Sequence, residues 1–570
     1  MQEEKILEHP DKYDAIVIGT GITGGWAAKE LCENGLKTLV LERGRDVKHI
    51  VDYPTMNQDP WDFKYRGNKN PEDIEQKPKQ NRSYVLNPAS AHWFVNDFKH
   101  PYNEEKRFDW IRGYHVGGRS LMWARQSYRL SDIDFEANKK DGHGVDWPVR
   151  YKDIAPWYDK VEEFIGVSGE NLGLPQLPDG KFGPPMELNC VEKELQKKIS
   201  ENYSDRQLTI GRCAHKTGDA VHEGRSNCQF RDRCVRGCPF GGYFSSNSST
   251  LPAAEKTGNM HLRPNSIAYE IVYDEKIKKA TGVKIVDAET KEKIFFKADI
   301  IFSCASAIAS AGILMQSKSK RFPNGLGNDS GELGHNVMDH TSGAGASATV
   351  EGFEDVYYKG RRPSGFYIPR FRNINKETKN KGFLRGYGYQ GSGRRSNWKR
   401  ALNEMTFGEN LKEDLLKPGE WTIRIGAFGE CLPYHDNKIT LNYEKLDEWG
   451  LPTINFNVEY KENELKMKED MKNEAVEILK TAGFKNVKGY NKKSFPGIAI
   501  HEMGSARMGH DPKTSILNKY NQIHTVPNVY VTDGAFMASS ACQNPSLTYM
   551  AFTARAANHA VKEFNKRHKK

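Results

Sequence analysis

The sequence predicts an α/β protein, α+β overall, in which a Rossmann-like nucleotide-binding domain is interrupted by a second domain built on an antiparallel sheet. Three observations predict this class. An apolar run at Tyr13 to Ile18 leads directly into a glycine-rich turn and a helix, and a second apolar run at Val529 to Thr532 precedes a long helical pattern. Between them, residues 350–487 form strand-like runs rich in Tyr, Phe, Gly and Arg. Alternating βα segments beside a separate group of strands are typical of such an assembly.

The first predicted element is a βαβ unit. The run from Tyr13 to Ile18 alternates too little for a half-exposed strand and is apolar enough for a buried parallel one. An alanine-rich helix at Trp26 to Asn34 follows, and then a strand at Lys37 to Leu41.

A glycine fingerprint lies between that strand and that helix. Gly19, Gly21 and Gly24 form G-x-G-x-x-G, and Glu42 ends the second strand 23 residues after Gly19. The three glycines would make the tight turn, let the backbone approach a pyrophosphate and allow close helix packing, while the acid would accept from ribose hydroxyls. The pattern predicts dinucleotide binding, with a purely structural turn as the alternative. These residues alone do not separate FAD from NAD.

Later elements are predicted from composition and periodicity. The segment rich in Pro, Asp and Asn has poor periodicity and predicts a lid, whereas short β-type runs predict a meander and apolar or charged periodic runs predict helices. In chain order these are the lid at 46–103, the meander at 261–298, a strand and helix at Ile300 to Met315, a helix at about Glu462 to Thr481, and a helix at Ser546 to Phe564 opened by Pro545.

The predicted domain boundaries follow from these elements. They are a nucleotide-binding domain at 1–49, 104–130, 250–345 and 495–570, a lid at 50–103, a substrate-binding domain at 131–204 and 346–494, and a cysteine-containing loop at 205–249. Aromatic residues of the substrate domain such as Tyr387 and Trp398 could be core or rim, and none is assigned as a ligand.

Composition excludes several classes of protein. The chain has 570 residues, enough for two to four domain-sized units. No run approaches the roughly 20 apolar residues that a spanning helix needs. The net charge of +10 is diluted, and the basic tail from Lys562 to Lys570 lacks interleaved aromatic residues, so nucleic-acid recognition is not expected. The acidic start has no basic and apolar leader pattern, so we expect no signal peptide of its own.

Nine cysteines at low density argue against a disulfide scaffold, and three of them cluster. Cys228, Cys234 and Cys238 form C-x5-C-x3-C on a loop shaped by Gly and Pro. Soft thiolates that converge on such a loop suit an iron–sulfur cluster or zinc. A zinc site completed by His222 and a set of buried thiols are the alternatives, and Cys213 is either a fourth ligand or a core thiol.

His501 and Asn544 are the candidate catalytic pair. His501 follows the apolar run FPGIAI, which predicts that it emerges from the end of a strand, and Asn544 precedes Pro545 and the last helix. A histidine can take the proton of a hydroxyl group while an amide orients the same oxygen. The N-terminus of the helix would stabilise an anionic reduced flavin ring. A lone histidine in this position is more commonly structural, and the neighbouring amide and helix favour catalysis.

These residues resemble the glucose–methanol–choline (GMC) oxidoreductases, which bind FAD and oxidise alcohols. The resemblance is carried at both ends and in the middle by VIGTGITGG with Glu42, GYHVGGRSLMW, CASAIASAGILMQS, GHNVMDH, HEMGSARMG and VTDGAFMASSACQNPSLTYMA. It implies that His501 is the catalytic base, that Asn544 is its partner, and that FAD contacts further positions. The implied cofactor-binding residues are Gly19, Gly21, Gly24, Glu42, Gly117, Gly118, Ser120, Ala268, Asp533, Gly534, Asn544 and Pro545.

Within the family the chain most resembles the large subunits of bacterial sugar dehydrogenases, such as glucoside 3-dehydrogenase. Some of these carry a three-iron cluster on a C-x5-C-x3-C triplet, so the resemblance implies a [3Fe–4S] cluster on Cys228, Cys234 and Cys238. It also implies a small partner subunit, an electron acceptor such as a cytochrome c or quinone, and either periplasmic export assisted by that partner or a cytoplasmic location. No histidine occurs at residues 120–123, where some relatives attach FAD, so we expect non-covalent FAD.

The resemblance implies oxidation of a secondary hydroxyl of a sugar or glycoside, with C3 of glucosides preferred. His501 would take the hydroxyl proton, hydride would pass to flavin N5, and electrons would leave through the cluster. The alternatives are a peroxide-forming oxidase like pyranose oxidase, a dehydrogenase of glucose, fructose or gluconate, and a non-catalytic subunit that retains FAD for electron transfer.

Overall fold

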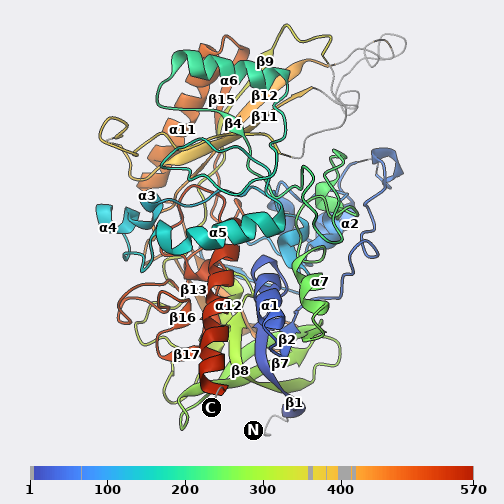
Figure 1. The fold of residues 1–570 in the computed structure, drawn as a ribbon, viewed down its shortest axis with the longest axis vertical. Coiled ribbons are helices and arrows are strands. Elements are labelled where there is room, and N and C mark those ends of the chain that lie inside the picture. The colour runs from blue at the N-terminus through green and yellow to red at the C-terminus, as the bar shows by residue number, and fades with distance from the viewer. Residues whose placement is uncertain are drawn as a thin grey trace.

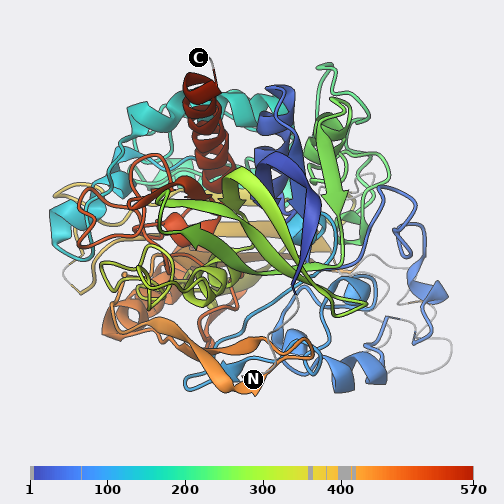
Figure 2. The ribbon, with the colours of Figure 1, turned by 90° about the horizontal axis from the view of Figure 1, so that it is seen from below.

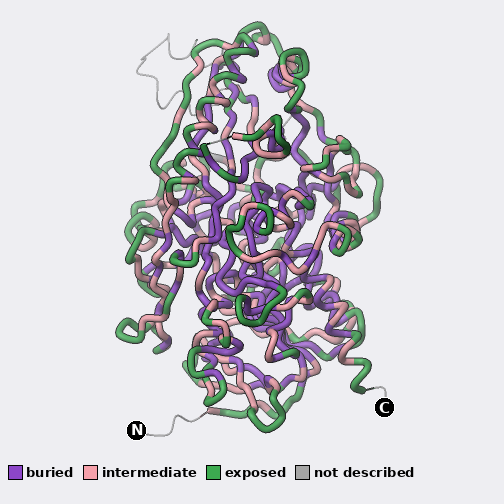
Figure 3. The backbone as a smooth tube through the Cα atoms, turned by 90° about the vertical axis from the view of Figure 1, so that its left-hand side faces the viewer, coloured by how far each residue is buried: buried purple, intermediate pink, exposed green. Residues whose placement is uncertain are grey.

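The computed structural model of the protein describes residues 6–65, 67–356, 364–380, 382–395, 413 and 419–568. Figure 1 shows two stacked parts, with the helices α1 (Ile22–Glu33) and α12 (Ser546–His568) in the lower part and α6 (Cys190–Asn202) and α11 (Glu462–Thr481) in the upper part. The buried backbone runs through the middle of both parts, and exposed segments lie mainly at the periphery (Figure 3). Among the described helices, none combines the length and apolar character needed to cross a bilayer.

The lower part is built on an eight-stranded sheet with a parallel centre, which Figure 2 shows from below. Strands from very different positions along the chain lie side by side in it, and the pairs β1/β2, β1/β8, β8/β17 and β2/β5 are parallel. Its main path is β16 (Gln522–Ile523), β17 (Val526–Val531), β8 (Lys293–Ser303), β1 (Ile6–Ile18), β2 (Thr38–Leu41) and β5 (Met260–Arg263), with β6 (Ser266–Asp274) and β7 (Lys279–Asp287) attached through β8.

Burial explains why these segments form the sheet centre. All four residues of β2 and the last four of β1 are buried, as expected for parallel strands covered on both faces. The helix α1 packs against α12 and against the short α7 (Thr250–Glu255), and α12 packs against α5 (Tyr151–Ile165). The helix α8 (Ala307–Gln316), entered directly from β8, contacts β6. The carboxyl ends of β1 and β8 lie at the edge of the sheet that faces the upper part of the molecule (Figure 1).

The upper part contains a six-stranded antiparallel sheet. Its buried aliphatic and aromatic residues pack against α11, which contributes Met467, Met471 and Ile478, and against α6. The alternation of buried and exposed residues along β12 is the period of two of a half-covered strand. The strand order is β15 (Lys485–Asn491), β9 (Ala344–Val350), β12 (Trp421–Gly429), β11 (Tyr387–Arg395), β10 (Phe366–Ile368) and β4 (Thr209–Ile210).

The remaining elements are short. A third sheet joins β13 (Lys438–Leu446), β14 (Pro452–Asn457) and β3 (Asn103–Glu104). Within the described residues of the predicted lid the helical segments are short, and the longest is α2 (Pro71–Gln76); the helices α3 (Asp132–Phe135) and α4 (Ala137–Asp141) follow the lid.

Most predicted elements are confirmed, with one correction. The helix at Glu462 to Thr481 is observed as α11, and the last helix begins at Ser546 and extends to His568. The prediction that a strand leads into His501 was wrong, because residues 495–500 form turns. Tyr387 belongs to the core and donates from its hydroxyl to Asp470, 2.6 Å away. Trp398 lies outside the described residues, and the predicted domain boundaries stay a prediction.

Candidate active site

One elongated cavity of about 590 Å³ begins at the carboxyl ends of β1 and β2 and reaches the underside of the six-stranded sheet. Gly19 and Glu42 line one end, and His501, Asn544 and Gln390 line the other. The predicted nucleotide-binding turn and the predicted catalytic pair therefore open into the same space, although they are more than 450 residues apart in the sequence.

The glycines of the first turn form a cradle with an open side. A Cβ on Gly24 would overlap the carbonyl oxygen of Gly19, and a Cβ on Gly19 would lie 2.6 Å from the carbonyl oxygen of Cys304. A Cβ on Gly21, in contrast, would meet no atom within 4 Å. Gly24 and Gly19 thus pack α1 against β1 and β8, while Gly21 faces space at the N-terminus of a helix. A pyrophosphate fits such a position, because free N–H groups and the helix dipole favour an anion there.

This difference predicts opposite consequences for two alanine substitutions. Gly24→Ala should prevent normal folding, since the new methyl group meets backbone. Gly21→Ala should fold normally and lose FAD, since its methyl group would occupy the place of the pyrophosphate. Circular dichroism and the flavin absorbance of the purified variants measure the two effects. A folded Gly21→Ala protein with full FAD content would contradict the assignment of the cradle.

Glu42 is buried at the end of β2 and is held by hydrogen bonds. Its carboxylate accepts from the Thr20 hydroxyl at 2.5 Å and from the Gly44 N–H at 3.0 Å. Burial raises its pKa, and the hydrogen bond from Thr20 opposes that rise. The Thr20 hydroxyl also accepts from the N–H of Gly117 at 2.9 Å, so the two glycine loops are tied together.

The second glycine loop packs directly against the first. A Cβ on Gly118 would lie 3.5 Å from the Cα of Gly21, and Gly117 has a positive φ of 86° that favours glycine. Ser120 donates from its hydroxyl to the carbonyl oxygen of Gly117 at 2.6 Å and thereby fixes the turn. Asp533 accepts from Ser310 at 2.5 Å and from the Ala535 N–H at 3.0 Å. Burial raises its pKa to about 6.

The structure brings most of the predicted cofactor and catalytic residues together. Gly24 and Gly117 lie behind the cavity wall, where they serve packing. The predicted residues that line the cavity are Gly19, Gly21, Glu42, Gly118, Ser120, Ala268, His501, Asp533, Gly534, Asn544 and Pro545. Their individual roles stay predictions.

His501 sits on a turn that is organised by one buried carboxylate. Asp339 accepts from the backbone N–H groups of Gly497 at 2.7 Å, Ala499 at 3.0 Å and His501 at 3.0 Å. Positive φ values at Gly497 and Ile500 bend this segment too sharply for a strand. This is the physical reason why the apolar run before His501 is not a strand.

Both nitrogens of the His501 ring have partners. Nε2 lies 3.3 Å from Asn544 Nδ2, and Nδ1 lies 2.9 Å from Nδ1 of His340. Gln390, on the six-stranded sheet, donates from Nε2 to Asn544 Oδ1 at 2.5 Å. The Phe428 ring lies 6.0 Å from the His501 ring, measured between centroids, and adds an apolar wall. The pair is thus assembled from the turn, from the segment before α12 and from the second sheet.

The electrostatics of the site keep His501 neutral. Burial lowers its pKa well below the ordinary value, and the neighbouring His340 and Arg119 lower it further. Arg119 is paired with Glu502 through two hydrogen bonds of 3.0 and 2.8 Å. A neutral imidazole carries a free lone pair and can accept a proton, which is the requirement for a general base.

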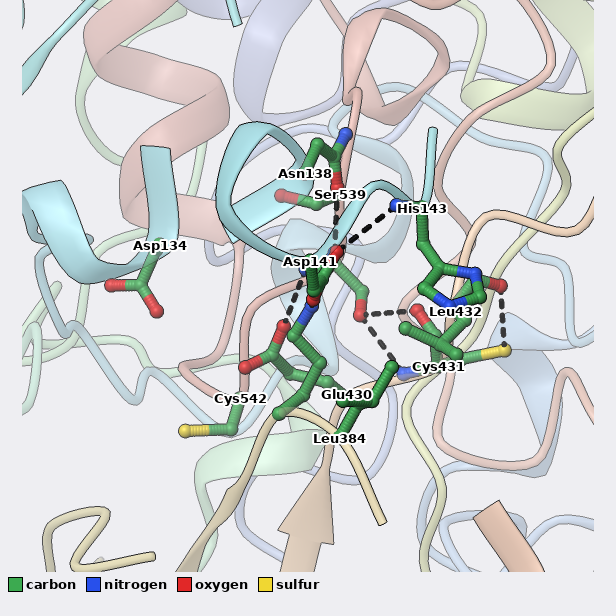
Figure 4. Close-up of polar contacts among 12 residues, drawn as sticks. Asp134, Asn138, Asp141, His143, Leu384, Glu430, Cys431, Leu432, Ser539 and Cys542 are labelled. Carbon is green, nitrogen blue, oxygen red and sulfur yellow. Dashed lines mark hydrogen bonds and ion pairs between the residues drawn. The ribbon is translucent and has the colours of Figure 1, made fainter. Parts of the chain in front are cut away.

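A buried polar cluster supports the segment before Asn544. Figure 4 shows Glu430, Cys431 and Ser539 beside Asn138 and Asp141. Asn138 donates to the carbonyl oxygen of Ala538 at 2.8 Å, and Trp147 donates to the Ser539 hydroxyl at 2.8 Å. Glu430 is paired with two arginines, Arg370 at 2.7 Å and Arg385 at 3.3 Å. Hydrogen bonds to this cluster therefore hold the segment 538–543 in place.

The three clustered cysteines lie on the loop between β4 and α7. This loop reaches the cavity through Val235, whose carbonyl oxygen accepts from the Trp93 indole at 3.0 Å. Burial, with a smaller contribution from the nearby Cys234 and Cys238, raises the pKa of Cys228 to about 11, so the three thiols are electrostatic neighbours.

Other residues tie this loop to the predicted lid and to the core. The lid is held by Arg231, which donates to the Met56 carbonyl oxygen at 2.8 Å, by Arg236, which donates to the Gln58 carbonyl oxygen at 2.5 Å, and by an ion pair between Arg233 and Asp59. The histidine beside the thiols is His215, with Nε2 3.8 Å from the Cys234 sulfur.

The thiols do not form a closed metal site. Within the described ranges, no three His, Cys, Asp or Glu side chains are placed to hold a metal ion. Cys213 is a buried core thiol that contacts Gln126, and His222 contacts the carbonyl oxygen of Phe164 at 3.2 Å. Thiolates are ligands that iron–sulfur clusters and zinc take, but the described positions of these three thiols do not form a metal site.

Several residues of the site were missed by sequence reasoning. His340 and Arg119 lie inside the quoted stretches GHNVMDH and GYHVGGRSLMW, so only their roles went unassigned. Gln390 lies in a glycine-rich strand that carries no motif, and only the three-dimensional pairing of β11 with β12 places it opposite Asn544.

A dinucleotide cradle that shares a cavity with a histidine–amide pair defines a flavin-dependent oxidoreductase. The chain belongs to the GMC oxidoreductase family: residues 13–342 match the N-terminal part of that family and residues 433–553 its C-terminal part, both described as GMC oxidoreductase. It is accordingly an FAD-dependent oxidoreductase that acts on CH–OH groups.

The chain is similar along nearly its whole length to characterised proteins. It is 26% identical to 2-methyl-1,2-propanediol dehydrogenase of Mycolicibacterium austroafricanum, over 97% of this chain and 96% of that protein. It is 25% identical to the fructose dehydrogenase large subunit of Gluconobacter japonicus, over 96% and 97%. It is also 25% identical to paromamine 6'-oxidase of Streptomyces fradiae, over 98% and 92%.

A solved structure shares the fold. A single-residue variant of formate oxidase from Aspergillus oryzae RIB40 superposes with a TM-score of 0.61, at 14% identity, over 98% of this chain and 99% of that one. This likeness shows the fold.

Proposed function

We propose that the protein is an FAD-dependent dehydrogenase that oxidises a secondary hydroxyl of a sugar or glycoside, with C3 of glucosides as the preferred position. The observation that carries the proposal is the placement of the His501–Asn544 pair at the far end of the cavity that begins at the dinucleotide cradle. The relatives named above include a fructose dehydrogenase subunit and a 2-methyl-1,2-propanediol dehydrogenase, which supports this substrate class. The preference for C3 rests on the resemblance of HEMGSARMG and ACQNPSLTYM to glucoside 3-dehydrogenases.

In the proposed mechanism the chain positions the substrate and moves one proton. Bound FAD supplies the acceptor for the hydride that leaves the substrate carbon. His501 accepts the hydroxyl proton on Nε2, which faces Asn544. Asn544 donates from its amide to the hydroxyl oxygen as negative charge develops there. The C–H and O–H bonds are lost together, and a ketone leaves.

An anaerobic absorbance titration tests the substrate class. The purified protein is titrated with methyl glucoside and with glucose while the flavin bands are followed. Bleaching by the glycoside, with a 3-keto product, is the expected result. A flavin that dithionite reduces but no sugar reduces would favour a subunit that only transfers electrons.

The paromamine 6'-oxidase likeness favours one second candidate, a sugar oxidase that passes electrons to oxygen. Oxygen uptake in the presence of substrate separates the two functions. Fast, stoichiometric formation of peroxide would favour the oxidase, and slow oxygen uptake together with fast reduction of an artificial acceptor would favour the dehydrogenase.

We also propose that Cys228, Cys234 and Cys238 hold an iron–sulfur cluster of the [3Fe–4S] type, which would supply one-electron transfer. Their spacing and mutual proximity support this. A small partner subunit, an acceptor such as a cytochrome c or quinone, and export with that partner belong to the same proposal. The likeness to the fructose dehydrogenase large subunit supports a partner.

Iron analysis of cysteine variants tests the cluster. Anaerobically purified protein should contain about three iron atoms per chain, and Cys228→Ser should lower this value while reduction of the flavin by sugar persists. Cys190→Ser, at the start of α6, is the matched control and should keep its iron. Zinc in place of iron, or metal-free protein after anaerobic reconstitution, would contradict the proposal.

A further inference from the structure

We propose that His340 is a positioning residue that fixes which nitrogen of His501 carries the proton. This inference deepens the proposed function, because it explains how His501 is held in the form that can act as a base. It rests on a chain of four contacts that runs from a backbone carbonyl group to Gln390.

The chain of contacts begins at the carbonyl oxygen of Ser540, which can only accept a hydrogen bond. Nε2 of His340 lies 3.3 Å from the carbonyl oxygen of Ser540, so this nitrogen carries the hydrogen. Both His340 and Ser540 are completely buried, so water does not compete for the contact. Burial also lowers the pKa of His340 to about 4, which leaves the ring neutral at pH 7. A neutral ring with its hydrogen on Nε2 has a lone pair on Nδ1.

The tautomer of His501 then follows. The two Nδ1 atoms are 2.9 Å apart, and a hydrogen bond between them needs one hydrogen. Since His340 offers only a lone pair there, His501 must donate. A neutral His501 with its hydrogen on Nδ1 carries its lone pair on Nε2, which is the atom that faces Asn544.

The direction of these hydrogen bonds also fixes the orientation of the amide side chains of Asn544 and Gln390. The Nε2 lone pair of His501 requires an N–H from Asn544, so Nδ2 and not Oδ1 faces the imidazole at 3.3 Å. Asn544 Oδ1 is thereby left to accept from Gln390. The two ends of an amide are nearly alike in shape, so the orientation of Asn544 follows from the direction of its hydrogen bonds. The Ser540 carbonyl group, at the start of the chain of contacts, fixes that direction.

Ser540 and His340, at the start of this chain of contacts, are held rigidly by further hydrogen bonds. The Ser540 hydroxyl accepts from the Cys431 N–H and donates to the Cys431 carbonyl oxygen, both at 3.0 Å. The Tyr460 hydroxyl donates to the backbone carbonyl oxygen of His340 at 2.8 Å. The His340 and His501 rings meet edge to face, with 4.9 Å between centroids. A flip of either imidazole ring would therefore break several of these contacts.

The test compares His340→Asn with His340→Leu, two side chains of similar size and branching. Oδ1 of asparagine replaces the Nδ1 acceptor, whereas leucine offers none. We expect His340→Leu to slow sugar-driven reduction of the flavin roughly 10- to 100-fold, with a much smaller change in the substrate concentration for half-maximal rate, and His340→Asn to restore most of the rate. Equal rates for leucine and wild type, or equal losses in both variants at unchanged FAD content, would overturn the proposal.

A further variant and a readout without substrate keep the test decisive. If His340→Leu does not fold, His340→Gln replaces it, because glutamine can reach Ser540 but puts no acceptor at the Nδ1 position. Nitrogen-15 histidine spectra, with His501 assigned by its loss in His501→Gln, report the tautomer directly. We expect hydrogen on Nδ1 in the wild type and on Nε2 or both atoms in His340→Leu. Hydrogen on Nε2 of His501 in the wild type would refute the inference, even if no sugar reduced the flavin.

Discussion

Replacement of His501 with alanine is expected to slow reduction of the flavin by the alcohol substrate by about 100- to 10,000-fold. The imidazole is neutral because burial and nearby positive charge lower its pKa, and its Nε2 atom faces the cavity beside Asn544. Alanine removes the proton acceptor and leaves the Asp339 contacts intact, since these use the backbone N–H of residue 501. FAD content should therefore stay the same.

Stopped-flow absorbance under anaerobic conditions measures this effect in a single turnover. His510→Ala is the matched control, because His510 lies on the same stretch of chain and is exposed. The control should reduce its flavin at the wild-type rate. A His501→Ala protein that retains FAD and more than about a tenth of the wild-type rate would remove His501 from the role of base.

The second large effect is expected for Asp339→Ala, which should destabilise the protein by about 3 kcal/mol or more. Asp339 is completely buried and satisfies three backbone N–H groups, and alanine would leave all three without a partner. Asp339→Asn keeps an acceptor oxygen and should lose less. Thermal unfolding and FAD retention compare the variants. Equal melting temperatures for Asp339→Ala and the wild type would show that the turn does not depend on this carboxylate.

The same residue predicts a pH dependence with a definite sign. Burial, together with the nearby Glu502, raises the folded-state pKa of Asp339 from 3.8 to about 7. A carboxyl group whose folded pKa exceeds its unfolded pKa contributes stability at low pH that is lost as the pH rises through the folded value. The wild type should thus gain stability relative to Asp339→Asn, by about 2 to 4 kcal/mol, between pH 7 and pH 4. A stability difference that does not change with pH would contradict this.

The sequence predicted local features well and distant contacts poorly. The sequence correctly placed Gly19 in the turn between strand and helix, Gly24 where the helix packs closely, and Glu42 at the end of the second strand, because all three lie within one βαβ unit of about 30 residues. The 20 residues of α11 were predicted from their charged and apolar periodicity. The turn before His501 was predicted as a strand, because its apolar run carries no sign of the carboxylate at position 339 that bends it.

Contacts between distant segments explain the rest of what was missed. His340 and His501 are 161 residues apart, and Gln390 and Asn544 are 154 apart, so no local pattern links them. The cysteine triplet is the opposite case, since its spacing is fully visible in the sequence while the placement of its loop depends on contacts that arginines within the motif make to the distant lid.

The parallel sheet has a consequence for how the protein is made. β8 lies between β1 and β17, and β17 begins more than 200 residues after β8 ends. A ribosome that adds about 5 to 20 residues per second needs roughly 10 to 45 seconds to cover that distance. During this time the last residues of β8, which pair with β17, lack that neighbour, and residues 501 and 544 do not yet exist. The emerging chain should therefore depend on chaperones, and flavin uptake should be among the last events of its biogenesis.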